Sequence, residues 1–240
     1  MAYKLKIQDK ILAKSKAVDA RKNYNFELSS NIDILNEFHN QKNFTIVYMP
    51  FSDKIDGFSC RRKNHFIIVL NSKNNVNRQN FTCAHELYHL LYEYNEKDEY
   101  VPTVNSEEIA DTFASYFLIP EDALIKFLTD SQIVNKRKIS LEDIVKVENY
   151  FQVSRKAMLN RLRDFGIITA EEQEKYSYDV IRSVKKVGGD FSNYTEPVNP
   201  KIEVVGEMKA LVAKLVEINK ISKGKYEEYI FDMFEDLEDI

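Results

Sequence analysis

The spacing of apolar residues predicts helices at the start of the chain. Between Tyr3 and Phe38 these residues recur at the spacing of helices that bury one face. The stretch accommodates two or three such helices, and Asn31 or Asp33 is a suitable cap for the last of them.

The spacing then changes to that of strands. Phe44–Tyr48 is β-branched and aromatic, which predicts a strand. Gly57–Arg61 and His65–Leu70 predict a hairpin that turns at residues 62–64. We therefore expect a small antiparallel sheet in the first third of the chain.

A longer helix is expected from about Phe81 to Tyr94. It follows an Asn- and Ser-rich loop at residues 71–80, which offers Asn77 or Asn80 as the N-cap. A second helical segment opens near Glu107 and ends at Ile119, because Pro120 cannot continue a helix.

The rest of the chain is predicted to be helical, with one interruption. The helical patterns are Glu121–Thr129, Leu141–Phe151, Arg155–Phe165, Glu203–Asn219 and Ser222–Leu237. Gly188-Gly189 and two prolines break the periodicity of residues 176–200, which predicts a linker or an ordered loop.

These patterns predict an α+β protein in four parts. A mainly helical core with the small sheet spans residues 1–130, and a helix-turn-helix-like segment spans 131–175. The linker or loop occupies 176–202, and a C-terminal helical pair with an acidic tail occupies 203–240.

Composition adds limits on partners and location. The 240 residues are 44% apolar and 30% charged with a formal net charge of -4, so nucleic-acid binding would need a local basic patch. The charged N-terminal segment lacks the apolar run of a secretory signal, and no stretch approaches the roughly 18 apolar residues of a membrane helix. We expect a cytoplasmic protein with no membrane partner.

The segment His85-Glu86-Leu87-Tyr88-His89 matches the pattern H-E-x-x-H. Histidines four positions apart lie on one face of a helix, so both imidazoles can bind one metal ion, and Glu86 lies beside them within reach of a water. The pattern predicts a zinc-hydrolase site with His85 and His89 as ligands and Glu86 as the general base. A pair of purely structural histidines is the alternative.

A catalytic zinc also needs a third protein ligand. The acidic candidates after the motif are Glu96, Asp98, Glu99, Glu107, Glu108 and Asp111. We take Glu107 as the ligand, and Asp111, one turn later, as the acceptor for the outer ring N–H of a zinc-bound histidine. Glu108 is the alternative ligand, although Asn105-x-x-Glu108 resembles a capping box in which Glu108 would bond a backbone N–H.

Other polar and aromatic residues near the motif have weaker claims. His39 and His65 are not expected to bind the metal. An oxyanion stabiliser cannot be assigned, since the candidates Tyr88, Tyr92, Arg78 and Tyr116 are each expected to serve packing or the surface.

Four segments around the motif carry a family resemblance. They are Ile68–Asn71, Arg78–Leu91, Glu107–Ala114 and Leu118–Pro120. They resemble the ImmA/IrrE family of metallo-endopeptidases, and the resemblance extends over about residues 25–168. It implies that the core at residues 1–130 is a zincin-like metallopeptidase core. Members are similar to gluzincins, with His, His and Glu ligands, which agrees with Glu107. The family commonly has Asn where this chain has Asp111.

The resemblance implies a substrate class. Known members act on helix-turn-helix repressors of mobile elements or of DNA-damage responses, and they relieve repression by cleavage. The Lys-, Asn- and Ile-rich composition is typical of a low-GC bacterium or its phage. A helix-turn-helix repressor is therefore the expected partner and substrate, with Zn²⁺ as the cofactor.

The segment Leu141–Phe165 has the pattern of a helix-turn-helix, and a similar segment follows the protease core in the family. Its second helix carries four cations: Arg155, Lys156, Arg161 and Arg163. They are candidates for contact with DNA or with a substrate repressor, and a merely solvated face is the alternative.

Two functions from different classes follow. The first is a zinc endopeptidase that cleaves a transcriptional repressor with Glu86 as the general base. The second is a non-enzymatic regulator or anti-repressor that binds a repressor or DNA, with a structural or inactive metal site.

Overall fold

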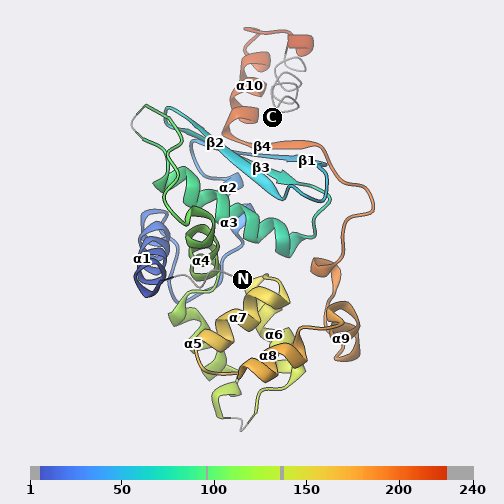
Figure 1. The fold of residues 1–240 in the computed structure, drawn as a ribbon. Helices are drawn as coiled ribbons and strands as arrows, with labels where there is room; N and C mark the ends of the chain where they lie inside the picture. Colours follow the sequence, from blue (N-terminus) through green and yellow to red (C-terminus); the bar gives the residue numbers. More distant parts are fainter. Residues whose placement is uncertain (1–5, 96, 136–137, 226–240) are drawn as a thin grey trace.

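Small residues let the first helix pack closely against the helix that carries Glu107. Helix α1 (Ile7–Asn23) buries Ala13, Ala17 and Ala20 completely and lies against α4 (Ser106–Leu118) in the computed structural model of the chain (Figure 1). The structure describes residues 6–95, 97–135 and 138–225. Helix α2 (Ile34–His39) follows and is capped by Asp33, which accepts a hydrogen bond from the backbone N–H of Asn36.

The sheet has the strand order β2-β3-β1-β4. Strands β2 (Gly57–Arg62) and β3 (His65–Asn71) form the predicted hairpin. The expectation of an all-antiparallel sheet is wrong, because β1 (Phe44–Met49) pairs with β3 and runs parallel to it. The α+β class is confirmed, with a mixed sheet.

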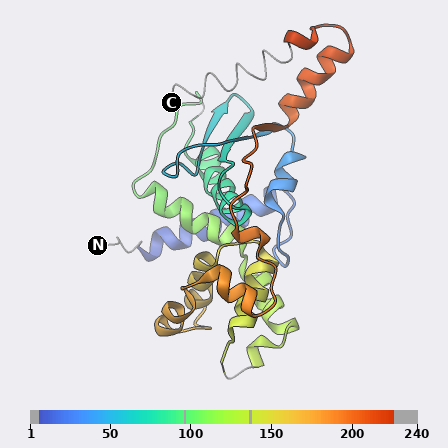
Figure 2. The ribbon, with the colours of Figure 1, turned by 90° about the vertical axis from the view of Figure 1, so that its right-hand side faces the viewer.

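The fourth strand comes from the far end of the chain. Residues Glu203–Gly206 form β4, antiparallel to β1, where the sequence pattern predicted the start of a helix. The helix begins only at Glu207, as α10 (Glu207–Glu217), and Figure 2 shows it extending away from the sheet. Most of the predicted last helix and the acidic tail lie outside the described residues.

Helix α3 (Val76–Tyr92) carries the H-E-x-x-H motif and joins the sheet to α4. It contacts β2 and β3 on one side and α4 on the other (Figure 1). It starts before Phe81 because the side chain of Asn75 accepts a hydrogen bond from the N–H of Arg78 at 3.0 Å. The predicted caps Asn77 and Asn80 are wrong, since both lie inside the helix.

The helices after the motif pack as a unit below this core (Figure 1). They are α5 (Glu121–Asp130), the 3-10 turn η1 (Ile133–Asn135), α6 (Leu141–Phe151), α7 (Arg155–Asp164) and α8 (Ala170–Tyr176). Helices α6 and α7 agree with the predicted helix-turn-helix, and Gln152 between them adopts a left-handed conformation with φ 52°. One buried apolar cluster runs from Ala13 to Ile168, so this unit shares its core with the motif region.

The segment predicted as a linker or loop is ordered. It contains α9 (Val180–Lys186) and the 3-10 turn η2 (Ser192–Tyr194), and Val184 and Tyr194 pack against Val145 of α6. None of the helices in the described part of the chain is long and apolar enough to cross a membrane.

Candidate metal centre

Helices α3 and α4 bring three potential metal ligands together. The Nε2 atoms of His85 and His89 lie 3.0 Å apart. The carboxylate of Glu107 lies 3.2 Å from His85 Nε2 through Oε2 and 3.7 Å from His89 Nε2 through Oε1. Within the described residues these three side chains form a group whose donor atoms all lie within 4.8 Å of one another.

The donor set and its spacing fit a tetrahedral zinc ion. Nitrogen and carboxylate ligands bind zinc at about 2.0–2.2 Å, so ligand atoms at tetrahedral angles stand about 3.3 Å apart. The three distances between donor atoms bracket this value. Two histidines and one glutamate leave the fourth position of such a site open, as in catalytic rather than structural zinc sites.

The outer nitrogens of both histidines contact carboxylates. His85 Nδ1 lies 2.9 Å from Asp111 Oδ1, and His89 Nδ1 lies 2.7 Å from Glu93 Oε2. Because a carboxylate only accepts hydrogen bonds, each Nδ1 carries a proton, and the neutral form of either ring has its lone pair on Nε2. Two such lone pairs at 3.0 Å repel unless a proton or a metal ion lies between them, so the arrangement suits a cation.

Burial and ion pairing act in opposite directions on His85. Burial lowers the pKa of its imidazole, whereas the hydrogen bond with Asp111 and the charges of Glu86 and Glu107 raise it, and the net shift is upward. The surrounding carboxylates therefore stabilise positive charge at this position, whether from a proton or a metal ion.

Glu93 is a functional candidate that sequence reasoning missed. Its carboxylate is fully buried at the end of α3, and besides His89 it accepts hydrogen bonds from Tyr100, Thr103 and Ser106. Burial acts to raise its pKa, but the hydrogen bonds from Ser106, Thr103 and His89 outweigh burial and lower the pKa to about 2. A signal was present, because Glu93 stands four residues after His89 on the same helix face.

Glu86 lies on α3 with its carboxylate buried. Burial raises its pKa, and a 2.8 Å hydrogen bond from Ser59 Oγ to Glu86 Oε2 acts in the opposite direction. Ser59 belongs to β2 and was also missed, because a lone serine in a strand carries no sequence signal for this role. The hydrogen bond occupies Oε2, and Oε1 is the carboxylate oxygen that no described side chain holds in this way.

The structure places Glu107, and not its neighbour Glu108, among the candidate metal ligands. Glu108 is exposed and lies outside the group of three donors. The predicted capping box is wrong, because Asn105 adopts a left-handed conformation with φ 61° and its side chain caps nothing. Ser106 is the polar residue held at this helix start, through its 2.7 Å hydrogen bond to Glu93.

The remaining candidates have other partners. His39 Nε2 contacts Tyr48 Oη, and His65 Nε2 contacts Thr45 Oγ1, so neither reaches the centre. Among the acidic candidates Asp98 pairs with Arg61 and Glu99 accepts from Asn95, while Glu96 lies outside the described residues.

The four side chains considered for oxyanion stabilisation are also engaged elsewhere. Tyr92 Oη donates to Lys16 O, Arg78 pairs with Asp56, and the ring of Tyr116 lies beneath Arg161. Tyr88 is buried and its Oη lies 3.4 Å from Lys16 Nζ. The contacts of these residues agree with the expected packing and surface roles.

Two of the four cations predicted on α7 are unavailable to a partner. Arg155 is buried and forms a two-point ion pair with Glu148, and Arg161 is buried and donates to Ile119 O. The prediction that these two contact DNA or substrate is therefore wrong. Lys156 and Arg163 are exposed.

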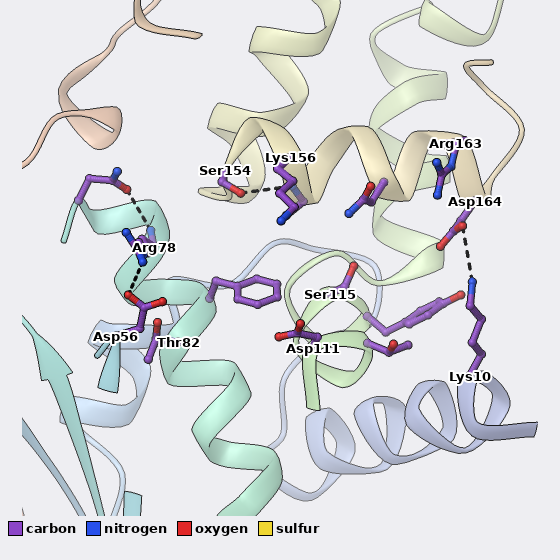
Figure 3. Close-up of a pocket in the computed structure, with 16 residues that line it drawn as sticks. Lys10, Asp56, Arg78, Thr82, Asp111, Ser115, Ser154, Lys156, Arg163 and Asp164 are labelled. Atoms are coloured by element: carbon purple, nitrogen blue, oxygen red, sulfur yellow. Dashed lines mark hydrogen bonds and ion pairs between the residues drawn. The ribbon is translucent and has the colours of Figure 1, made fainter. Parts of the chain in front are cut away.

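A cleft of about 670 Å³ reaches Asp111, although none of the three donors and not Glu86 lines it. Figure 3 shows it between α7 and the surface formed by α1, α3 and α4, with Lys156 and Arg163 on one side and Arg78 and Asp111 on the other. Because Asp111 is the partner of His85, an occupant of this first cleft would lie next to the metal centre.

The comparison with protein families agrees with this geometry. The model of peptidase M78, described as the IrrE N-terminal-like domain, matches residues 40–163, which run from before β1 into the last turn of α7 and include all the candidate ligands. The resemblance noted from the sequence is thereby confirmed. A search among curated proteins gave no significant match.

Proposed function

The chain belongs to the peptidase M78 family of IrrE N-terminal-like metallopeptidases, and on this basis we propose that it is a zinc-dependent endopeptidase. The structural observation that carries the proposal is the grouping of the donor atoms: the Nε2 atoms of His85 and His89 lie 3.0 Å apart, and the carboxylate of Glu107 lies within 3.7 Å of both. Nitrogen and carboxylate donors in this number favour zinc among the common metal ions of hydrolases.

Zinc bound by His85, His89 and Glu107 supplies Lewis acidity, which lowers the pKa of a nearby water and polarises a peptide carbonyl. Glu86 is the base in this proposal. Its raised pKa brings the carboxylate closer to the range in which it both accepts and returns a proton near neutral pH. Ser59 holds Oε2, so Oε1 takes the proton from water and delivers it to the nitrogen of the departing amine.

Asp111 and Glu93 act on the ligands rather than on the substrate. Each fixes the tautomer of one histidine, so that Nε2 faces the metal. Glu93 is further held by Ser106, at the start of the helix that carries Glu107. This hydrogen bond links the positions of the second histidine and the third ligand.

The proposed substrate is a helix-turn-helix repressor of a phage, a mobile element or a stress response. Its support is the family resemblance, together with a cleft beside the centre that is large enough for an extended peptide segment. Lys156 and Arg163 line this first cleft and are the remaining candidates for substrate contact.

The test is co-expression with candidate repressors, comparing the wild type with Glu86→Gln. We expect a repressor fragment only with the wild type, and equal zinc content in both proteins. Glu107→Ala should lose zinc, whereas the exposed Glu108→Ala should keep it. A protein that relieves repression equally well with Glu86→Gln and yields no fragment would support the non-enzymatic regulator instead.

A further inference from the structure

A second cleft, of about 810 Å³, opens beside the first and contains no predicted site residue except those at the start of α7. It lies between the N-terminal ends of α3 and α7 and the helix α9. Asn75, Ser154 and Lys156 line both clefts, so the two meet at these helix ends. Figure 3 shows this junction from the first cleft, with Ser154 and Lys156 across from the part of α3 that carries Arg78.

Asn77 is the unusual residue of the second cleft. It lines the cleft with only 1% of its surface exposed, and neither its Oδ1 nor its Nδ2 has a hydrogen-bond partner among the described residues. An unpaired buried polar group costs about 1–3 kcal/mol, so native proteins rarely keep one without a use. A carboxamide both donates and accepts, and the cleft that Asn77 lines is a side from which a ligand can supply this partner.

The cleft also gathers cations that lack carboxylate partners. Lys156, Arg182 and Lys185 line it, and none forms an ion pair within the described part of the chain; Lys185 lies over the ring of Phe191 at 4.3 Å. Arg155 is already neutralised by Glu148. Asp179 is the one carboxylate among the described residues of the lining, so their accessible charge is positive.

Helices α3 and α7 begin at this cleft, and both are long enough for their N-terminal ends to attract an anion. Asn75 caps the N–H of Arg78 in α3, and Ser154 caps the N–H of Ala157 in α7. The first amides of each helix lack acceptors within the helix and attract an anion through the helix dipole. The remaining lining is apolar and comes from Val180, Ile181 and the ring of Tyr194.

We propose that the second cleft is a binding site for an organic phosphate with a flat, hydrogen-bonding body, such as a nucleoside monophosphate. The phosphate lies at the helix ends among Lys156, Arg182 and Lys185. The body packs on the apolar lining and pairs with the carboxamide of Asn77, whose donor and acceptor suit the edge of a heterocycle. This inference does not depend on the proposed peptidase activity, because no metal ligand lines the cleft.

The test is isothermal titration calorimetry on the full-length, metal-loaded protein. The probes are the four common nucleoside monophosphates, with inorganic phosphate as the matched probe that lacks the flat body. We expect at least one nucleotide to bind more tightly than inorganic phosphate, and the variant Arg182→Gln/Lys185→Gln to bind at least about tenfold more weakly. Lys186→Gln, an exposed change on the same helix outside the cleft, should leave the affinity unchanged.

Three further measurements locate the ligand. Asn77→Ala should weaken nucleotide binding. It should leave the binding of inorganic phosphate and the stability of the free protein unchanged, because the removed group has no hydrogen-bond partner among the described residues. Nucleotide binding should persist in Glu107→Ala, which separates this cleft from the metal centre. In a gel shift with random duplex DNA at several salt concentrations, the wild type and the Arg182→Gln/Lys185→Gln variant should behave alike.

Several results would overturn the proposal. These are equal affinity for nucleotides and inorganic phosphate, no binding of either probe, equal effects of the cleft and Lys186 variants, and loss of binding in Glu107→Ala. Duplex DNA binding that depends on Arg182 and Lys185, without nucleotide binding, would assign the cations to nucleic acid instead.

Discussion

Replacing Glu93 by glutamine isolates the role of the buried carboxylate behind His89. The two side chains have nearly the same volume, so packing is preserved. Glu93 Oε1 accepts from the N–H and the hydroxyl of Thr103, while Oε2 accepts from His89, Tyr100 and Ser106. A backbone N–H can only donate, so it keeps the amide oxygen of the introduced glutamine on the Thr103 side.

The amide nitrogen then faces His89 Nδ1. Because this nitrogen carries hydrogens, His89 must turn its Nδ1 into an acceptor and move its proton to Nε2, where the proton blocks the metal. Loss of such an outer partner lowers metal affinity about 10–100-fold, which corresponds to about 1.4–2.7 kcal/mol. If the amide flips instead, the Thr103 N–H loses its acceptor, at a cost of about 1–3 kcal/mol to folding.

The assay is competition for zinc with a chromophoric chelator, alongside urea unfolding of the metal-free protein. We expect Glu93→Gln to lower zinc affinity by about 10–100-fold, and Glu108→Gln, which changes an exposed carboxylate on α4, to bind zinc like the wild type. A folded Glu93→Gln protein with wild-type zinc affinity and wild-type stability would refute the tautomer argument.

Two further predictions concern the framework around the site. Arg161→Ala should destabilise the protein by about 2–4 kcal/mol in urea unfolding, because the buried guanidinium donates to Ile119 O and lies 3.9 Å from the ring centroid of Tyr116. Arg163 is exposed, so Arg163→Ala should change the free energy of unfolding by no more than about 0.5 kcal/mol. Equal effects of the two changes would contradict the assignment of Arg161 to the core. Gly206→Ala should destabilise the protein by about 1–3 kcal/mol, since φ is 119° and a Cβ would lie 2.5 Å from Phe44 O. Gly224→Ala is the control, because a Cβ there meets only an ordinary contact at 3.9 Å. A Gly206→Ala protein as stable as the wild type would contradict this account of the end of β4.

The elements that local sequence determines were predicted closely. Helix α6 has the predicted bounds Leu141–Phe151, because Ser140 and Asp143 form a complete capping box before an amphipathic stretch. The hairpin of β2 and β3 was likewise visible in its alternating pattern and its turn. Helix α6 and this hairpin depend on residues that are close in the sequence, so the local sequence is sufficient to predict them.

The elements that depend on distant partners were missed. Helix α3 begins with a mainly polar stretch, and its buried Asn80 donates to Gln152 O in the connection between α6 and α7, a contact that no periodicity can reveal. Strand β4 exists because Glu203–Gly206 meets the free edge of β1, far away in sequence. For the same reason the charges on α7 were misjudged, since the burial of Arg155 and Arg161 follows from Glu148 and Ile119 and not from the helix itself.

The two histidines of the centre differ in the burial of the carboxylate that holds each of them. His89 is anchored by Glu93, which is fully buried and bonded to Thr103 and Ser106 as well. His85 is anchored by Asp111, an exposed residue that lines the first cleft. An occupant of that cleft can therefore contact Asp111 and alter the hydrogen bond to His85, while His89 stays shielded. Metal retention should thus depend mainly on the Glu93 side, and any response of the centre to a bound peptide should pass through Asp111.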